Sequence, residues 1–256
     1  MTLHAYGDSW TEGHGTDLES ELSIKDRQEL RKVRNEYSWP KLLSEKLNIG
    51  HINNGKSGSS NISIFNAVSD DVKNGMIKKG DLVVIMWSSS LRDNVPFLPN
   101  NEWISWSIEQ LVETPNRFIN SYQSGSSEYD EFLKKYKEFF IGSLFNQNYY
   151  NIVNQNYIIF LQKLLDSYGI KHYMCDAFET MIINLQKVDD FTHLINKKNY
   201  WNFGQKNFKE HLYGLKRFDI WEEILKTKQS LGGIHPNKKG HEILTEELHR
   251  CISKIL

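Results

Sequence analysis

The chain has 256 residues, which is enough to bury a sizeable core in one large α/β domain or two small ones, and we expect one. Its 31 Lys and Arg residues are balanced by 32 Asp and Glu residues, and a net charge of −1 gives no electrostatic reason to expect a nucleic-acid or membrane partner. No segment approaches the ~20 apolar residues that cross a bilayer, and no basic stretch followed by an apolar one opens the sequence, so we expect a cytoplasmic protein.

Short apolar segments alternate with segments of helical periodicity along the chain. Residues 2–6 have the length and apolarity of a buried strand, and Gly7 then marks a sharp exit. Residues 82–87, Leu-Val-Val-Ile-Met-Trp, form the strongest predicted strand, and they are apolar on both faces, as is typical of the centre of a parallel sheet. Further strands are predicted at 51–53 and 170–175, and helices at 41–47, from 62 onward, at 152–165 and at 240–256.

Residues 95–150 and 188–230 do not show this alternation of strands and helices, and we expect them to be insertions. The first is rich in aromatic residues, some of them at helical spacing, such as Phe132, Tyr136 and Phe139. We interpret it as a mainly helical, aromatic-rich insertion whose rings pack in a core, with a binding platform as the alternative.

The alternation of strands and helices predicts an α/β fold with a parallel sheet that is covered on both faces. In such sheets the active site lies beyond the carboxyl ends of the strands. Ser9, Gly58, Ser88 and Asp176 each follow a predicted strand. We therefore expect these four residues to converge at one edge of the sheet.

Ser9 in the sequence Gly7-Asp8-Ser9 is the candidate nucleophile. A serine hydroxyl reacts only beside a general base and near donors that hold the oxyanion. His235, directly before the last predicted helix, is the best candidate for the base. Asp8 is expected to hydrogen-bond the backbone of the turn. Glu12 and His14 lack the spacing of a metal pair, and they are expected to line the entrance or to face solvent.

These residues resemble the conserved blocks of the SGNH, or GDSL, hydrolase superfamily. That family has a Gly-Asp-Ser block near its amino terminus, an Asn followed by Ser-Gly in a second block, and His-Pro with a trailing Gly-His near its carboxyl terminus. The blocks match here at Gly7, Asp8 and Ser9, at Asn53, Ser57 and Gly58, and at His235, Pro236, Gly240 and His241.

The resemblance implies a three-layer α/β/α fold of the flavodoxin-like kind, with about five parallel strands. It implies that Ser9 is the nucleophile and His235 the base, and that the backbone N–H groups of Ser9 and Gly58 form an oxyanion hole. His241 is expected to be structural. Neither a metal nor an organic cofactor is implied, and the substrate would be a small-molecule or carbohydrate ester.

Two positions depart from the family's pattern. The central strand of the family is usually followed by an Asn that donates to the oxyanion, whereas this chain has serines at 88–90, so that Ser89 or Asn94 would have to substitute. The family usually has an Asp three residues before the histidine, where this chain has Gly232. A backbone carbonyl near Gly232 or a carboxylate from elsewhere could orient His235, or else the catalyst is a slow Ser-His dyad.

The sequence thus predicts a GDSL-type esterase that works through an acyl-enzyme, with O-acetyl groups on carbohydrate as the first substrate. A catalytically silent member of the fold that binds carbohydrate or serves a structural role is one alternative, and an acyltransferase with the same Ser-His site is another. A minor alternative is nucleotide binding, because residues 50–57 fit the phosphate-loop pattern G-x-x-x-x-G-K-S. That motif requires a strand before its first glycine and a Mg²⁺-binding Asp after a later strand, and the sequence predicts neither.

Overall fold

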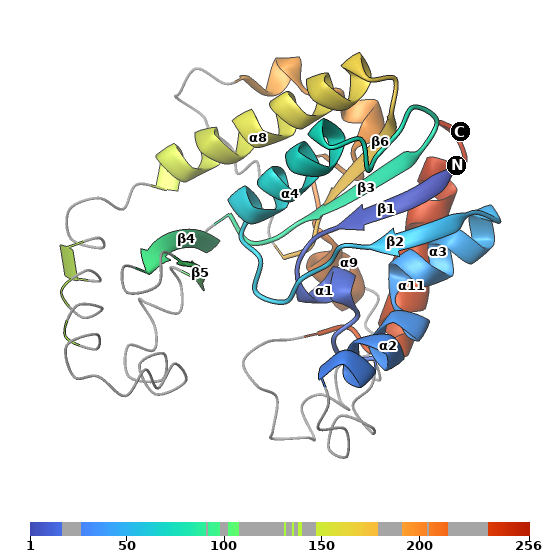
Figure 1. Cartoon of the computed structure of the whole chain (residues 1–256), viewed down its shortest axis with the longest axis horizontal. Helices are drawn as coiled ribbons and strands as arrows, with labels where there is room; N and C mark the ends of the chain where they lie inside the picture. Colours follow the sequence, from blue (N-terminus) through green and yellow to red (C-terminus); the bar gives the residue numbers. More distant parts are fainter. Residues whose placement is uncertain are drawn as a thin grey trace.

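A parallel sheet of four strands in the order β2-β1-β3-β6 forms the centre of the computed structural model (Figure 1). Its strands are β1 (Thr2–Tyr6), β2 (Gly50–Asn53), β3 (Leu82–Trp87) and β6 (Lys171–Asp176). The structure describes residues 1–16, 27–90, 92–97, 102–107, 131, 135, 138–139, 147–178, 191–203, 205–214 and 235–256.

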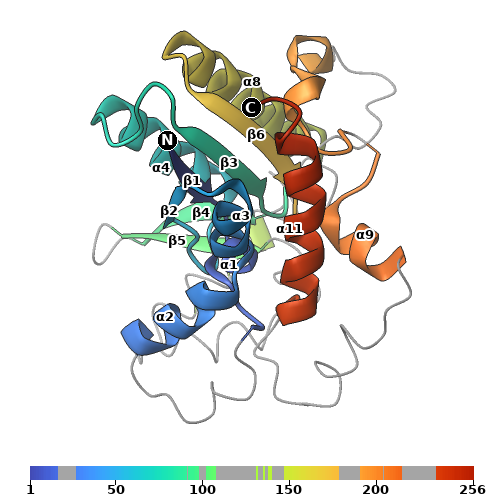
Figure 2. The same cartoon turned by 90° about the vertical axis from the view of Figure 1, so that its right-hand side faces the viewer.

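Helices cover both faces of the sheet, as Figures 1 and 2 show. The helices α4 (Asn61–Lys73) and α8 (Gln147–Ser167) lie on one face, and α3 (Trp39–Leu47), α9 (Phe208–Gly214) and α11 (Lys238–Ile252) lie on the other. The short α1 (Ser9–Glu12) follows β1, and α2 (Arg27–Tyr37) precedes α3. Two 3₁₀ helices, η2 (Phe191–Leu194) and η3 (Lys197–Asn199), follow β6.

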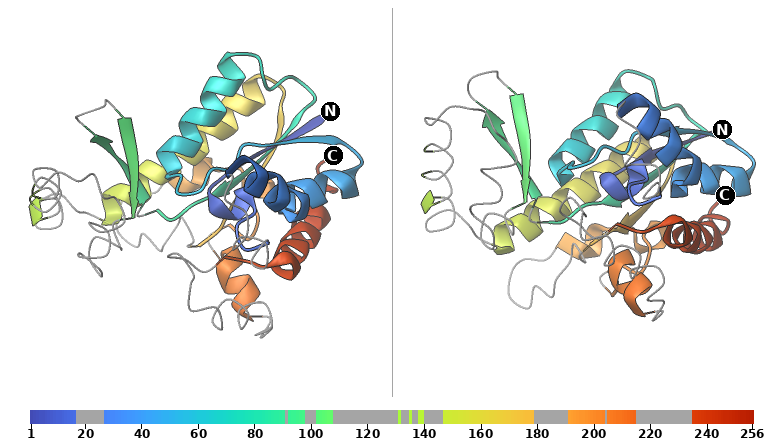
Figure 3. Two further views of the ribbon diagram at one scale, coloured as in Figure 1. Left: turned by 60° about the horizontal axis from the view of Figure 1, so that its bottom comes forward. Right: turned by 90° about the horizontal axis from the view of Figure 1, so that it is seen from below.

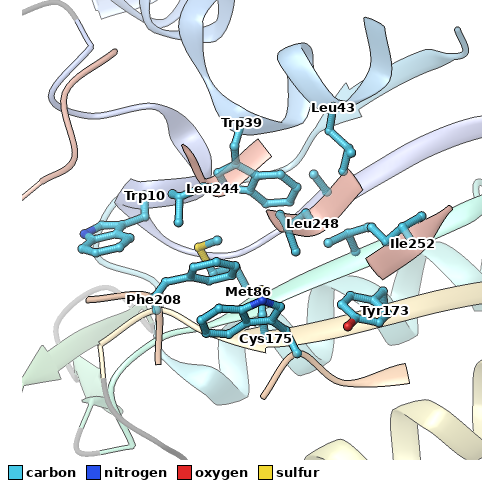
Figure 4. Packing of buried hydrophobic residues seen from close by; sticks show 14 of the residues in the cluster. Trp10, Trp39, Leu43, Met86, Tyr173, Cys175, Phe208, Leu244, Leu248 and Ile252 are labelled. Carbon is cyan, nitrogen blue, oxygen red and sulfur yellow. The ribbon is translucent and has the colours of Figure 1, made fainter. Parts of the chain in front are cut away.

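The apolar run of β3 supplies both halves of the core. Because successive side chains of a strand point to opposite faces, Leu82, Val84 and Met86 join one buried cluster and Val83, Ile85 and Trp87 join the other. The first cluster, between the sheet and α3, α9 and α11, is shown in Figure 4. It includes the fully buried side chains Trp10, Trp39, Leu43, Phe208, Leu244, Leu248 and Ile252.

The predicted α/β fold with a covered parallel sheet is confirmed, but the described residues contain four parallel strands where about five were expected. Past the β6 edge, the described residues make one isolated parallel bridge, between Met174 and Tyr200, and the Trp201 N–H donates to the Met174 carbonyl at 2.8 Å. The 3₁₀ helix η3 ends just before this bridge, and Asn202 has a φ of 44° just after it. The extended segment is therefore too short to form a fifth strand.

A hairpin of β4 (Arg92–Phe97) and β5 (Glu102–Ser107) follows the central strand. Figure 3 shows it standing away from the parallel sheet, and β4 contacts α4. This segment was predicted to begin a helical insertion, and that prediction is wrong for its first part. Asp93, Asn94 and Pro96 are unfavourable residue types for a strand, so the sequence pattern did not reveal the hairpin. Most of the rest of residues 95–150, with its aromatic spacing, lies outside the described residues.

The structure also bears on a membrane location. Among the helices that the structure describes, none has the length and apolar character needed to cross a bilayer.

Candidate active site

The strand order places a topological switch point at the carboxyl ends of β1 and β3. The chain leaves β1 to form β2 on one side and returns to form β3 on the other, and ligands of open α/β sheets bind where the order reverses in this way. Ser9 follows β1 and Ser88 follows β3. Gly7 must be a glycine here, since a Cβ would lie 2.1 Å from Thr11 Oγ1 and 2.8 Å from the Met86 carbonyl oxygen.

Ser9 and His235 are brought together from positions 226 residues apart in the chain. The Oγ atom of Ser9 lies 2.9 Å from Nε2 of His235, within hydrogen-bond distance. Ser9 is the first residue of α1, and its residue surface is 5% exposed. His235 lies two residues before Asn237, which caps the start of α11, because the Asn237 Oδ1 accepts from the Gly240 N–H at 3.0 Å.

The backbone beneath His235 packs against Gly15. This glycine has a φ of +90°, and a Cβ there would lie 2.5 Å from the Pro236 carbonyl oxygen and 3.0 Å from the His235 Cβ. Both the left-handed backbone and the close approach require glycine. The turn after α1 therefore sets how near His235 comes to Ser9.

Asp8 is fully buried and holds the turn that carries Ser9. Its Oδ1 accepts from the Trp10 N–H at 3.0 Å, which caps α1. Its Oδ2 accepts from the Ser88 hydroxyl at 2.8 Å and from Arg92 Nη1 at 3.0 Å. Arg92 Nη1 also donates to the Ser59 carbonyl at 3.2 Å. Asp8 thus connects the nucleophile turn to the segments that follow β2 and β3.

Gly58 lies in the loop between β2 and α4, in an exposed position with a φ of +81°. Among the described residues, no hydrogen bond uses its N–H group. Asn53, from the same sequence block, has a structural place: its Nδ2 donates to the Thr11 carbonyl at 2.9 Å, and its Oδ1 accepts from the Gly55 N–H at 3.0 Å.

Glu12 is buried, so of the two expectations for it, the one that it faces solvent is wrong. Its carboxylate accepts from the Ser57 N–H at 2.6 Å and from Arg31 Nε at 2.9 Å, and it lies 3.4 Å from His14 Nε2. Burial by itself would raise the pKa of Glu12, but the hydrogen bonds from His14 and Ser57 and the charges of His14 and Arg31 lower that pKa to about 2. The group is therefore a carboxylate at neutral pH.

The serines after β3 are held by Asn61, a residue that the sequence reasoning missed. Asn61 Oδ1 accepts from the Ser88 N–H at 2.8 Å, and its Nδ2 donates to the Asn154 Oδ1 at 3.1 Å. Ser89 is buried, whereas Asn94 lies in β4 with its side chain outside what the structure describes. Gly232 also lies outside the described residues. The only early sign of Asn61 was its place at the start of a predicted helix.

Asp176, the fourth residue expected at this edge, ends β6 and is buried. It accepts a hydrogen bond from the Tyr200 hydroxyl. Burial, with the neighbouring Asp176 charge, raises the pKa of Tyr200 far above its ordinary value, so the phenol keeps its proton. This pair links the end of β6 to the segment that makes the single bridge.

His241 is fully buried on α11, and its Nδ1 accepts from the Trp39 N–H at 3.2 Å. Burial lowers its pKa to about 3, with the His235 and His14 charges acting in the same direction and the His14 backbone acting against them. The imidazole is therefore neutral at physiological pH, and its Nδ1 accepts from the first residue of α3.

Acid is expected to destabilise the protein through His241. The folded pKa lies below the unfolded value of 6.5, so the unfolded state binds the proton first and stability falls as the pH drops below 6.5. For this residue alone the loss between pH 7 and pH 5 is about 2 kcal/mol. A His241→Asn variant keeps an acceptor for Trp39 and cannot titrate, so its urea-unfolding free energy should fall less over this range.

The comparison is confined to pH 5 and above because Glu12 begins to contribute only below its unfolded pKa of 4.5. The other buried histidines are present in both proteins, and their effect cancels in the difference. Equal pH slopes for the two proteins would contradict a neutral, buried His241.

The phosphate-loop interpretation does not fit the geometry. Gly50 opens the strand β2, and the element before it is the helix α3, whereas the motif needs a strand first. The Ser57 N–H, which would face a phosphate, donates to the Glu12 carboxylate instead. Among the described residues, no group of three or more His, Cys, Asp or Glu side chains could hold a metal ion.

No protein-family model matches this chain, and no curated protein matches it. Among solved structures, it is similar to the psychrotrophic esterase EstA from a Pseudoalteromonas species, at 14% identity over 99% of this chain and 97% of that one, with a TM-score of 0.47.

It is also similar to a lipolytic protein of the G-D-S-L family from Desulfitobacterium hafniense, at 12% identity over 98% of both chains and a TM-score of 0.40. A third similar structure is an acetyl xylan esterase, at 12% identity over 100% of both chains and a TM-score of 0.44. Identities and TM-scores this low do not carry a function from those proteins to this chain.

Proposed function

We propose that this chain is an esterase in which Ser9 is the nucleophile and His235 the general base. The observation that carries the proposal is the 2.9 Å distance between Ser9 Oγ and His235 Nε2, at the switch point of a parallel sheet. A base at this distance can take the hydroxyl proton as the oxygen attacks, which is what a weak nucleophile requires.

In the proposed reaction the Ser9 oxygen forms a bond to the ester carbonyl carbon while its proton moves to His235 Nε2. The carbonyl electron pair moves onto the oxygen and makes a tetrahedral oxyanion. When that pair returns, the bond to the alcohol breaks, and His235 gives its proton to the departing alkoxide. Water then attacks the carbonyl carbon of acyl-Ser9 while His235 takes a proton from it. The bond between that carbon and Ser9 Oγ breaks, His235 returns the proton to Ser9 Oγ, and the acid leaves.

The proposed oxyanion donors are the backbone N–H groups of Ser9 and Gly58. Ser9 is the first residue of a helix, where N–H groups have no partner within the helix. The Gly58 N–H makes no hydrogen bond among the described residues. Either Ser89 or Asn94 would supply a third donor in place of the family's asparagine.

A carbohydrate O-acetyl ester is the proposed substrate class. The support is compositional, because residues 95–150 are rich in tryptophan, tyrosine and phenylalanine, whose rings have large apolar faces. Hydrolysis of acetylated xylan, followed as released acetate, at a higher kcat/KM than hydrolysis of p-nitrophenyl butyrate, followed as released p-nitrophenol, would favour this class over lipid-like esters.

Replacing Ser9 with alanine tests the esterase proposal. The wild type is expected to turn over p-nitrophenyl acetate and to be labelled by a fluorophosphonate probe, because the probe traps an activated serine. The Ser9→Ala variant should lose all labelling, whereas Ser167→Ala, at an exposed position in α8, should retain it. Wild-type protein with neither turnover nor labelling would contradict the proposal and would favour a catalytically silent binding or structural role.

A further inference from the structure

Among the residues that the structure describes, none packs where a side chain of Gly58 would lie, and none accepts a hydrogen bond from its N–H group. A Cβ built on it meets nothing within 4 Å, and the residue is exposed. An oxyanion donor acts through preorganisation, which requires a fixed position before the charge develops. The residues on either side of Gly58 must therefore hold it.

On one side, Ser57 is tied to the helix that begins with the nucleophile. Its N–H donates to the Glu12 carboxylate at 2.6 Å, and Glu12 ends the single turn of α1 that starts at Ser9. Arg31 holds the carboxylate at 2.9 Å and also donates to the Gly55 carbonyl at 3.3 Å. A hydrogen bond to a carboxylate is roughly twice as strong as a neutral one.

On the other side, Ser59 is tied to the residue before the nucleophile. Its carbonyl accepts from Arg92 Nη1 at 3.2 Å, and the same nitrogen donates to Asp8 Oδ2 at 3.0 Å. The Asp8 side chain is fully buried and the Arg92 side chain is 20% exposed, so water screens this ion pair less than one on the surface.

Two sets of hydrogen bonds thus connect the residues on either side of Ser9 with those on either side of Gly58. One joins Glu12 to Ser57. The other joins Asp8 to Ser59 through Arg92. We propose that Glu12 and Arg92 are positioning residues that together hold the Gly58 N–H in place relative to Ser9. The inference rests on the proposed esterase function for its kinetic consequence, but its structural content, a fixed Gly58 amide, can be tested without catalysis.

The kinetic test uses Glu12→Gln and Arg92→Lys. Each variant keeps a polar side chain of similar size. Glu12→Gln loses the negative charge that accepts the hydrogen bonds, and Arg92→Lys loses the forked geometry of the guanidinium group that donates them. We expect each to lower kcat for p-nitrophenyl acetate by about 10-fold with KM changed less than twofold, because a displaced oxyanion donor weakens binding of the transition state alone. The matched surface changes Glu45→Gln and Arg250→Lys, which alter exposed ion pairs, should leave kcat unchanged.

The structural test follows the backbone amide of Gly58 by NMR in the same proteins. In the wild type its heteronuclear NOE should match that of β3 amides, and in Glu12→Gln and Arg92→Lys it should fall while the β3 values stay the same. A change that merely destabilised the fold would instead lower the protection of amides across the sheet against hydrogen exchange.

These two readouts separate the possible failures. If the wild type is no esterase but the heteronuclear NOE of the Gly58 amide falls in both variants, the proposed function fails, and the positioning role of Glu12 and Arg92 is supported. If the Gly58 amide is unchanged in both variants, or if the amide loosens in an active enzyme without a fall in kcat, the positioning role is overturned.

Discussion

Adding one methyl group at Gly15 is expected to lower kcat for p-nitrophenyl acetate by about 10²-fold. The new Cβ would lie 2.5 Å from the Pro236 carbonyl oxygen and 3.0 Å from the His235 Cβ, and the first contact is with backbone that cannot rotate away. The segment carrying His235 must shift, and a misplacement of about 1 Å in a catalytic group can cost 10²-fold in rate.

Gly80→Ala is the matched control for this prediction. Gly80 has a φ of +92°, close to the +90° of Gly15, so both alanines meet the same unfavourable backbone conformation. A Cβ at Gly80 meets nothing within 4 Å. Both variants should therefore lose thermal stability from backbone strain, Gly15→Ala the more because of its clash with Pro236, and only Gly15→Ala should lose kcat. Equal kcat values in the two variants would contradict the role given to Gly15.

The central part of the fold could be predicted because single local patterns specify it. The run Leu82–Trp87 is apolar on both faces, and only a strand between two helical layers buries both. The places of Ser9 and Ser88 follow from the same reasoning, because the carboxyl ends of parallel strands meet at one edge of a sheet. The sharp turn at Gly7, where the first strand ends, could be predicted because that residue is a glycine.

The parts that were missed depend on contacts between distant segments. Glu12 looks like any polar residue in the sequence, and its burial is explained only by Arg31 and by the Ser57 N–H, which come from other elements. Arg92 belongs to a hairpin whose residue types disfavour a strand, and its partner Asp8 lies 84 residues away. No periodicity carries such information, so charged residues near a site need a structure before their roles can be argued.

Replacing His235 with alanine is expected to lower kcat by at least about 10²-fold, and the size of the loss reports how the imidazole is oriented. In one serine protease with a complete triad, removing the histidine lowers kcat by about 10⁶-fold and removing the acid alone lowers it by about 3 × 10⁴-fold. A histidine that works without its acid thus retains roughly 10²-fold of catalytic effect. Gly232, which stands where the family has the acid, supplies no carboxylate.

The measurement is kcat of wild type and His235→Ala on p-nitrophenyl acetate, with His193→Ala, an exposed histidine in η2, as the control that should keep full activity. An unchanged rate in His235→Ala would contradict its assignment as the base. A loss near 10⁶-fold would show that a third group holds the imidazole in the correct tautomer, since only an imidazole oriented in this way contributes that much. A loss of about 10²-fold would indicate that His235 is positioned mainly by its packing on Gly15 and by the Asn237 cap of α11.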